Sequence, residues 1–266
     1  MFEVRCEDCI SIPGGMGILG DKSIDVVITD PPYSEHVHSK SRSGLSQDNR
    51  AKAKAAGKDN ISARAELGFE HITQDEMEAV ADHLARLARR WVIVFCDVES
   101  SHLWAGALVS TGALEYVRTM AWIKVGGAPQ FTGDRPAVGF EAMVLAHPPG
   151  KKRWNGGGKA GIYSVPTAID RDRSGDDVRI HTTQKPIVLM EQLVRDFSEQ
   201  GETILDPFAG SGTTGVAALA LDRKFIGWEK NPAYHALASE RIGNTRPLDR
   251  GFIANSAKNA AQGTLL

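Results

Sequence analysis

A predicted strand, a glycine-rich turn and a predicted helix follow one another between residues 203 and 221. This succession constrains the fold more than any other feature of the chain. Thr203–Leu205 is a short run typical of a strand that is buried on both faces of a sheet. Gly210, Gly212 and Gly215 then form a G-x-G-x-x-G pattern ahead of an apolar helical segment. Such a turn lets the backbone approach a ligand at the carboxyl end of a parallel strand, so the pattern predicts an α/β fold with a Rossmann-like, mostly parallel sheet.

An acidic residue follows this turn at the distance expected for a nucleotide site. Glu229 lies 19 residues after Gly210, at the end of the next predicted strand, Lys224–Glu229. The spacing completes the dinucleotide fingerprint, so a nicotinamide-dependent dehydrogenase is one alternative. A Walker phosphate loop is excluded, because Thr213-Thr214 stands where that loop requires Lys-[Ser/Thr].

The number of predicted strands argues against a dinucleotide-binding fold. Only one clear strand follows the turn, so strands from the N-terminal half must complete the sheet. The chain is therefore predicted to be a circularly permuted single nucleotide-binding domain with a seven-stranded sheet. Leu114–Val125 and Phe140–Ala146, which a Gly/Pro-rich loop joins, are predicted to form an antiparallel hairpin at one edge of that sheet.

A second buried strand ends in an acid, two prolines and an aromatic residue. Val26–Ile28 is apolar and β-branched, and Asp30-Pro31-Pro32-Tyr33 follows closely. Proline provides no ladder N–H and favours an extended conformation in the residue before it, so the strand must end there. A carboxylate and a rigid Pro-Pro carbonyl could together accept both hydrogens of one NH2 group, while Tyr33 stacks on the ring that carries it. A strand end followed by an ordinary turn is the alternative.

Both motifs resemble those of S-adenosylmethionine-dependent amino-methyltransferases, which methylate exocyclic amines of adenine or cytosine. Asp30–Tyr33 is similar to the catalytic tetrad of this family, and Asp206–Thr214 is similar to its cofactor loop. The tetrad precedes the loop, with room for target recognition between them, and this order resembles the β class of DNA amino-methyltransferases. His181–Pro186 resembles the family's segment before the cofactor strand, and Glu7–Cys9 resembles the stretch that borders the cofactor's adenine. Together these segments extend the resemblance over most of residues 2–242.

The resemblance implies a mechanism and a set of site residues, with no metal. Asp30 and the carbonyl of Pro31 would accept the hydrogens of the target amine, and Tyr33 would stack on a base flipped out of the duplex. The implied catalytic residues are Asp30, Pro31, Pro32 and Tyr33. The residues implied to bind S-adenosylmethionine are Asp8, Cys9, Asp30, Thr183, Lys185, Asp206, Phe208, Ala209, Gly210, Ser211, Gly212, Thr213, Thr214, Glu229 and Lys230.

The resemblance also bears on the target base and on the partners. An Asp at the first position of the tetrad favours the N6 amine of adenine, and the N4 amine of cytosine is the alternative. The chain lacks a Pro-Cys dipeptide, which argues against methylation at cytosine C5. Double-stranded DNA is the implied partner. A homodimer and a cognate restriction endonuclease stay open, as does a non-catalytic nucleic-acid-binding module.

Two insertions carry basic residues that could contact DNA. Residues 34–70 include six Lys or Arg side chains between Lys40 and Lys58, against a single acid in that interval. Residues 147–181 include the basic run Lys151–Arg153 and are the predicted target-recognition segment. A solvated surface loop is the alternative for both insertions. The predicted organisation is one methyltransferase domain over residues 1–246, interrupted by these insertions and followed by a tail over residues 247–266.

Composition limits the remaining classes of protein. A formal net charge of −2 means that any contact with DNA must come from local patches. Three cysteines predict a reducing, cytoplasmic location rather than a disulfide framework, and the resemblance implies a bacterial or phage-encoded protein. Cys6 and Cys9 have the spacing of only half a zinc site. No stretch approaches the roughly 20 apolar residues that a membrane-spanning helix needs.

Overall fold

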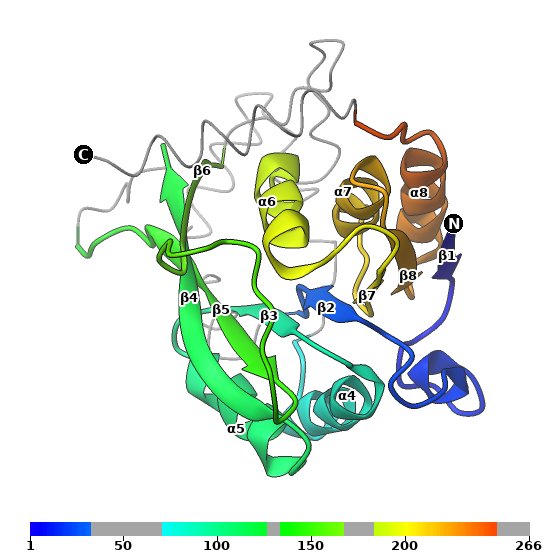
Figure 1. Ribbon diagram of the computed structural model, residues 1–266, viewed down its shortest axis with the longest axis horizontal. Helices are drawn as coiled ribbons and strands as arrows, with labels where there is room; N and C mark the ends of the chain where they lie inside the picture. The colour runs from blue at the N-terminus through cyan, green and yellow to red at the C-terminus, as the bar shows by residue number, and fades with distance from the viewer. Residues whose placement is uncertain (33–70, 127–133, 168–183, 249–266) are drawn as a thin grey trace, which may run out of the picture.

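The computed structural model describes residues 1–32, 71–126, 134–167 and 184–248. Over these ranges the chain forms one sheet with helices on both faces (Figure 1). Its eight strands have the order β1-β8-β7-β2-β3-β5-β4-β6. The strands are β1 (Phe2–Arg5), β2 (Val26–Thr29), β3 (Val92–Cys96), β4 (Glu115–Val125), β5 (Phe140–His147), β6 (Ile162–Pro166), β7 (Thr203–Asp206) and β8 (Lys224–Trp228).

The helices enclose two apolar cores, one on each face of the sheet. β2 contributes to both, because Val26 and Ile28 belong to the core under α6, α7 and α8, whereas Val27 belongs to the core under α4 and α5. This alternation explains why the strand is apolar at successive positions. The helices are η1 (Gly15–Ile18, a 3-10 turn), α4 (Gln74–Leu87), α5 (Ser101–Ser110), α6 (Ile187–Phe197), α7 (Thr213–Ala220) and α8 (Pro232–Gly243).

The sheet topology brings the two sequence motifs together. β2 pairs in parallel with β7, with Val27 opposite Leu205, although the two strands lie far apart in the chain. Both strands run in the same direction, so Asp30 and Asp206 emerge at the same carboxyl edge of the sheet. This edge is where open α/β sheets bind ligands.

The described sheet has eight strands, so the prediction of seven was wrong. The additional strand is β6, which lies within the insertion predicted over residues 147–181 and pairs in parallel with β4. The β4–β5 hairpin is antiparallel as predicted, but β6 and β3 flank it, so it does not form the sheet edge. β6 is held by its buried Tyr163 and Val165, and by the indole N–H of Trp122, which donates to the Val165 carbonyl at 2.9 Å.

The described chain continues past the predicted end of the domain at residue 246. Leu248 is buried in the core, and its N–H donates to the carbonyl of Ala220 at 2.7 Å. The insertion predicted at 34–70 lies outside the described residues, as does the remainder of the predicted tail after Leu248. None of the helices in the described ranges combines the length and hydropathy needed to cross a bilayer.

Candidate active site

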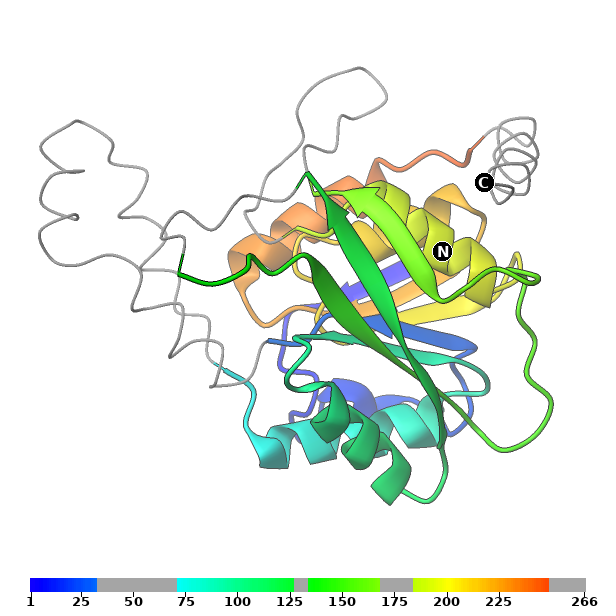
Figure 2. The same ribbon diagram turned by 90° about the vertical axis from the view of Figure 1, so that its left-hand side faces the viewer.

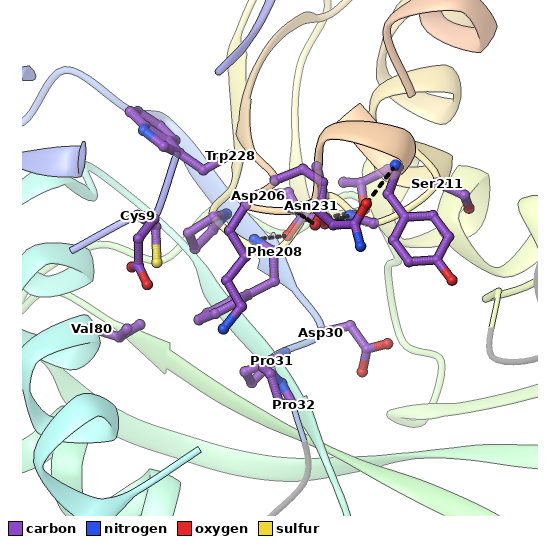
Figure 3. Close-up of a pocket in the computed structure, with 18 of the residues that line it drawn as sticks. Cys9, Asp30, Pro31, Pro32, Val80, Asp206, Phe208, Ser211, Trp228 and Asn231 are labelled. Atoms are coloured by element: carbon purple, nitrogen blue, oxygen red, sulfur yellow. Dashed lines mark hydrogen bonds between the residues drawn. The ribbon is translucent and has the colours of Figure 1, made fainter. Parts of the chain in front are cut away.

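A pocket of about 390 Å³ lies at the carboxyl edge of the sheet, between the ends of β2 and β7. In Figure 3 the segment Asp30–Pro32 lies on one side of the pocket, and Asp206, Phe208 and Asn231 lie on the other. The structure therefore brings most of the predicted site residues together. Those that line the pocket are Asp8, Cys9, Asp30, Pro31, Pro32, Lys185, Asp206, Phe208, Ala209, Gly210, Ser211, Thr213, Thr214, Glu229 and Lys230.

The remaining predicted site residues do not appear in this lining. Tyr33 and Thr183 lie outside the described residues. Gly212 caps the N-terminus of α7 with a φ of +81°, and a Cβ at this position would lie 3.0 Å from Ala238 on α8. A glycine is therefore needed at position 212 for its left-handed backbone and for the close packing of α7 on α8.

The pocket also contains residues that were not named among the predicted site residues, although Glu7, Gln184 and Pro207 belong to segments that the resemblance indicated. Trp228 and Asn231 flank the predicted pair Glu229-Lys230, so their place in the sequence could have indicated them. Glu76 and Val80 reach the pocket through the packing of α4, for which the sequence carries no local signal. The unselected residues are Glu7, Ile10, His71, Ile72, Glu76, Val80, Gln184, Met190, Pro207, Trp228, Asn231 and Tyr234.

Glu229 fixes the shape of the glycine loop. One of its carboxylate oxygens accepts the N–H of Gly210 at 2.9 Å, and the other accepts the N–H of Asn231 at 2.8 Å. Gly210 itself has a φ of +53°, in the left-handed region that favours glycine. The acid therefore joins the loop after β7 to the loop after β8, and each oxygen keeps a lone pair for a ligand.

The buried side chain of Asp206 holds the glycine loop through three hydrogen bonds. Its carboxylate accepts the hydroxyl of Thr29 at 2.8 Å, the hydroxyl of Thr214 at 2.6 Å and the N–H of Phe208 at 3.1 Å. Burial raises the pKa of Asp206 to about 6, although the hydrogen bonds from Thr214 and Thr29 oppose the rise. The network connects the end of β2 directly to the first turn of α7.

The raised pKa of Asp206 predicts a pH-dependent contribution to stability. The folded state binds this proton more tightly than the unfolded chain does, so the contribution is complete below pH 3.8 and is lost as the pH rises through about 6. The variant Asp206→Asn lacks this titration. The unfolding free energy of wild type minus that of the variant should therefore decrease by about 2 kcal/mol between about pH 4 and about pH 7. Chemical denaturation at the two pH values measures this difference, and a difference that stays constant or increases would contradict the assignment.

Asp30 contacts a residue that was predicted to bind the cofactor. The Lys185 ammonium donates to Oδ2 of Asp30 at 2.7 Å. Oδ1 of Asp30 is buried and has no hydrogen-bond partner among the described residues. Burial raises the pKa of Asp30 above its ordinary value, and the charge of Lys185 opposes the rise. The carboxyl group therefore presents one engaged oxygen and one oxygen with unused acceptor capacity.

Acidic side chains outnumber basic ones in the lining of the pocket. Six carboxyl side chains line it, against the two lysines Lys185 and Lys230; the acids are Glu7, Asp8, Asp30, Glu76, Asp206 and Glu229. Such a lining favours a ligand with net positive charge and disfavours one with a pyrophosphate. In the ranges that the structure describes, no three His, Cys, Asp or Glu side chains are grouped to hold a metal ion, and Cys6 and Cys9 belong to no such group.

The basic run Lys151–Arg153 lies far from this pocket. Its backbone joins the amino end of β3, where the Trp91 indole N–H donates to the Arg153 carbonyl. Lys152 pairs with Glu115 at 2.8 Å, and Arg153 lies 3.8 Å from Glu199. Figure 2 shows this loop, which joins β5 to β6, on the side of the molecule away from the carboxyl end of β2. The predicted contact of these residues with DNA therefore has no support from their position.

The chain is similar in sequence and in fold to known DNA methyltransferases. Residues 24–240 match the family model described as DNA methylase, of the N6/N4 type. The type II methyltransferase M2.MboI of Moraxella bovis is 24% identical over 261 residues, which cover 93% of this chain and 89% of M2.MboI. The structure of the M1.HpyAVI–SAM complex matches with a TM-score of 0.61 and 24% identity, covering 91% of this chain and 99% of that one. The PvuII DNA methyltransferase, described as cytosine-N4-specific, matches with a TM-score of 0.66 and 14% identity, covering 98% of this chain and 93% of that one.

Proposed function

Because the chain belongs to the N6/N4 DNA methylase family, we propose that it transfers a methyl group from S-adenosylmethionine to the N6 amine of adenine in a short site of double-stranded DNA. The observation that carries the proposal is the meeting of two motifs in one pocket. Asp30 comes from the end of β2 and the glycine loop comes from the end of the neighbouring β7. An acceptor for an amine and a cradle for a nucleoside are therefore adjacent.

The pocket fits this cofactor by shape and by charge. S-adenosylmethionine is a cation, and six carboxyl groups against two lysines favour it. Glu229, at the end of β8, retains acceptor capacity for ribose hydroxyls. Gly210 exposes its backbone to the pocket without a side chain, so a ligand can approach closely. A dinucleotide fits less well, because its pyrophosphate would face the same carboxyl groups.

The reaction requires the protein to activate a poor nucleophile, since the lone pair of an aromatic amine is delocalised into its ring. The carboxylate of Asp30 and the carbonyl of Pro31 accept the two amine hydrogens, which favours a pyramidal nitrogen. Asp30 also stabilises the positive charge that develops on the nitrogen. S-adenosylmethionine, when bound, supplies the methyl group on a sulfonium centre. Positioning by the rigid Pro31-Pro32 segment supplies much of the remaining rate.

A binding experiment separates this proposal from a dehydrogenase. Isothermal titration calorimetry should show binding of S-adenosylmethionine and of S-adenosylhomocysteine, and no binding of NAD, because the acidic lining repels a pyrophosphate. Binding of NAD with none of either sulfur compound would overturn the assignment.

Adenine is proposed over cytosine because Asp30 occupies the first position of the tetrad. N4-cytosine methylation is the second candidate, since the PvuII enzyme shares the fold and is described as cytosine-N4-specific. Sequencing that detects both modifications, applied to DNA from a host expressing the protein, decides between them and gives the recognition site. Modified adenine in one short motif is the expected result; modified cytosine would transfer the assignment to the second candidate.

The remaining features of the proposal follow from motif order and from the relatives. The tetrad precedes the cofactor loop, which supports the β class and a circularly permuted domain. The segment 147–181 is proposed to include target-recognition residues near the end of β6, at the carboxyl edge of the sheet, rather than at Lys151–Arg153. The type II methyltransferase M2.MboI supports a role in restriction-modification, with a cognate endonuclease as a proposed partner.

A further inference from the structure

Four side chains of alternating charge extend from the β4–β5 hairpin to the proposed catalytic acid. Lys124 on β4 lies 2.6 Å from Oε1 of Glu141 on β5, and Oε2 of Glu141 lies 3.0 Å from the Lys185 ammonium. The same ammonium contacts Oδ2 of Asp30 at 2.7 Å. β4, β5, the segment after β2 and the segment before α6 therefore meet in one chain of ion pairs, Lys124–Glu141–Lys185–Asp30.

The inner part of this chain is buried. The side chains of Glu141 and Lys185 each keep only 9% of their surface exposed. The Lys185 ammonium also lies over the rings of Phe95 and Trp122, at 5.1 Å and 5.9 Å from the ring centroids. Burial of this kind is costly, and a buried ion pair is weak evidence of a gain in stability. The cost is explained more readily by a role at the pocket, where the chain of ion pairs ends.

We propose that Glu141 is a positioning residue for methyl transfer, because through Lys185 it holds the carboxylate of Asp30 in one orientation at the pocket; this inference rests on the proposed function. A lysine has a long, flexible side chain, so one contact with Asp30 leaves its ammonium poorly located. Glu141 provides the second anchor, and Lys124 fixes Glu141 in turn. With Lys185 held on Oδ2, the carboxylate of Asp30 cannot rotate freely, and the buried Oδ1 keeps its unused acceptor capacity.

The charges around Asp30 give the proposal a distinctive signature. The groups that face Asp30 are Lys185 before α6, Glu141 on β5, Lys124 on β4, Asp206 on β7 and Cys96 on β3. Among these, the charge of Glu141 raises the pKa of Asp30, whereas the charge of Lys124 lowers it. Neutralising Glu141 and neutralising Lys124 should therefore move the titration of Asp30 in opposite directions.

Steady-state kinetics of DNA methylation on the full chain, as a function of pH, tests the proposal. Glu141→Gln should lower kcat on the order of 10- to 100-fold, as expected for a misplaced catalytic group, with little change in the Kd for S-adenosylmethionine. Its acid limb in the pH profile of kcat should move to lower pH. Lys124→Gln should lower kcat less and should move the acid limb to higher pH.

A matched control is Glu115→Gln, which removes a carboxylate from the same hairpin at an exposed pair with Lys152. This variant should keep the wild-type kcat and pH profile. If the wild-type protein methylates DNA and the kcat of Glu141→Gln equals that of Glu115→Gln, the positioning role alone is overturned. If the wild-type protein does not methylate DNA, the proposed function and this inference are overturned together. If thermal denaturation shows that Glu141→Gln is not folded, the pH profile of Lys124→Gln tests the proposal instead. An acid limb of kcat that does not move, or that moves to lower pH, in Lys124→Gln would contradict the proposal.

Discussion

Replacing Asp30 with Ala should lower the rate of DNA methylation by about 100- to 1000-fold, since one preorganised charge-stabilising group is commonly worth this much in kcat. The carboxylate is the group that accepts the amine hydrogen and stabilises the charge developing on nitrogen. Affinity for S-adenosylmethionine should stay close to that of wild type, because the glycine loop and Glu229 come from β7 and β8 rather than β2. Turnover with methyl-labelled cofactor and calorimetry measure the two quantities on the same protein.

The control for this variant is Asp21→Ala. Asp21 is an acid on the surface, 74% exposed, which pairs with Arg86, and neither residue lines the pocket. Its replacement should leave turnover unchanged. An Asp30→Ala protein with normal turnover would rule out the proposed mechanism, and one that also lost cofactor binding would show that Asp30 supports the cofactor site instead.

Replacing Gly210 with Val should abolish binding of S-adenosylmethionine. Position 210 has a φ of +53°, and a β-branched residue in this region is strained by about 1–3 kcal/mol. The variant would relieve the strain by moving the loop and breaking the hydrogen bond from the Gly210 N–H to Glu229. A side chain at this position would also occupy space that the ligand needs. The expected loss of affinity is at least about 100-fold, since 1.4 kcal/mol corresponds to a factor of ten.

Gly20→Val provides the matched glycine substitution. Gly20 is not in the left-handed region, and a Cβ there meets nothing within 4 Å. Calorimetry and the thermal shift produced by the cofactor should be unchanged in this variant. Wild-type affinity in Gly210→Val would exclude the glycine loop as the cofactor cradle.

Local sequence patterns were sufficient to predict the two central strands and the site at their carboxyl ends. The apolar sequences before Asp30 and before Asp206 each predict a strand that is buried on both faces of the sheet. In the structure both strands are buried, and their carboxyl ends lie together. The pocket consequently contains most of the residues that the two motifs indicated. The proximity of such motifs is predictable because the carboxyl ends of parallel strands lie at the same edge of a sheet.

Features that depend on long-range packing could not be predicted in this way. β6 is a five-residue strand with only two buried side chains, Tyr163 and Val165, and its pairing with β4 depends on the tertiary structure. The contact between Lys185 and Asp30 joins residues 155 positions apart, so spacing carries no information about it. The run Lys151–Arg153 has the composition of a DNA-binding segment, but its location at the amino end of the sheet is a property of the tertiary structure.

The most direct measurement of the central claim is the identity of the methylated nucleoside. Purified protein is incubated with double-stranded DNA and methyl-labelled S-adenosylmethionine, and the DNA is digested to nucleosides and analysed by mass spectrometry, with Asp30→Ala as the inactive reference. Label in N6-methyladenine is expected for the wild-type protein, and none for the variant. Label in 5-methylcytosine, or no transfer to DNA by the wild-type protein, would contradict amino-methylation, and label in N4-methylcytosine would contradict adenine as the target.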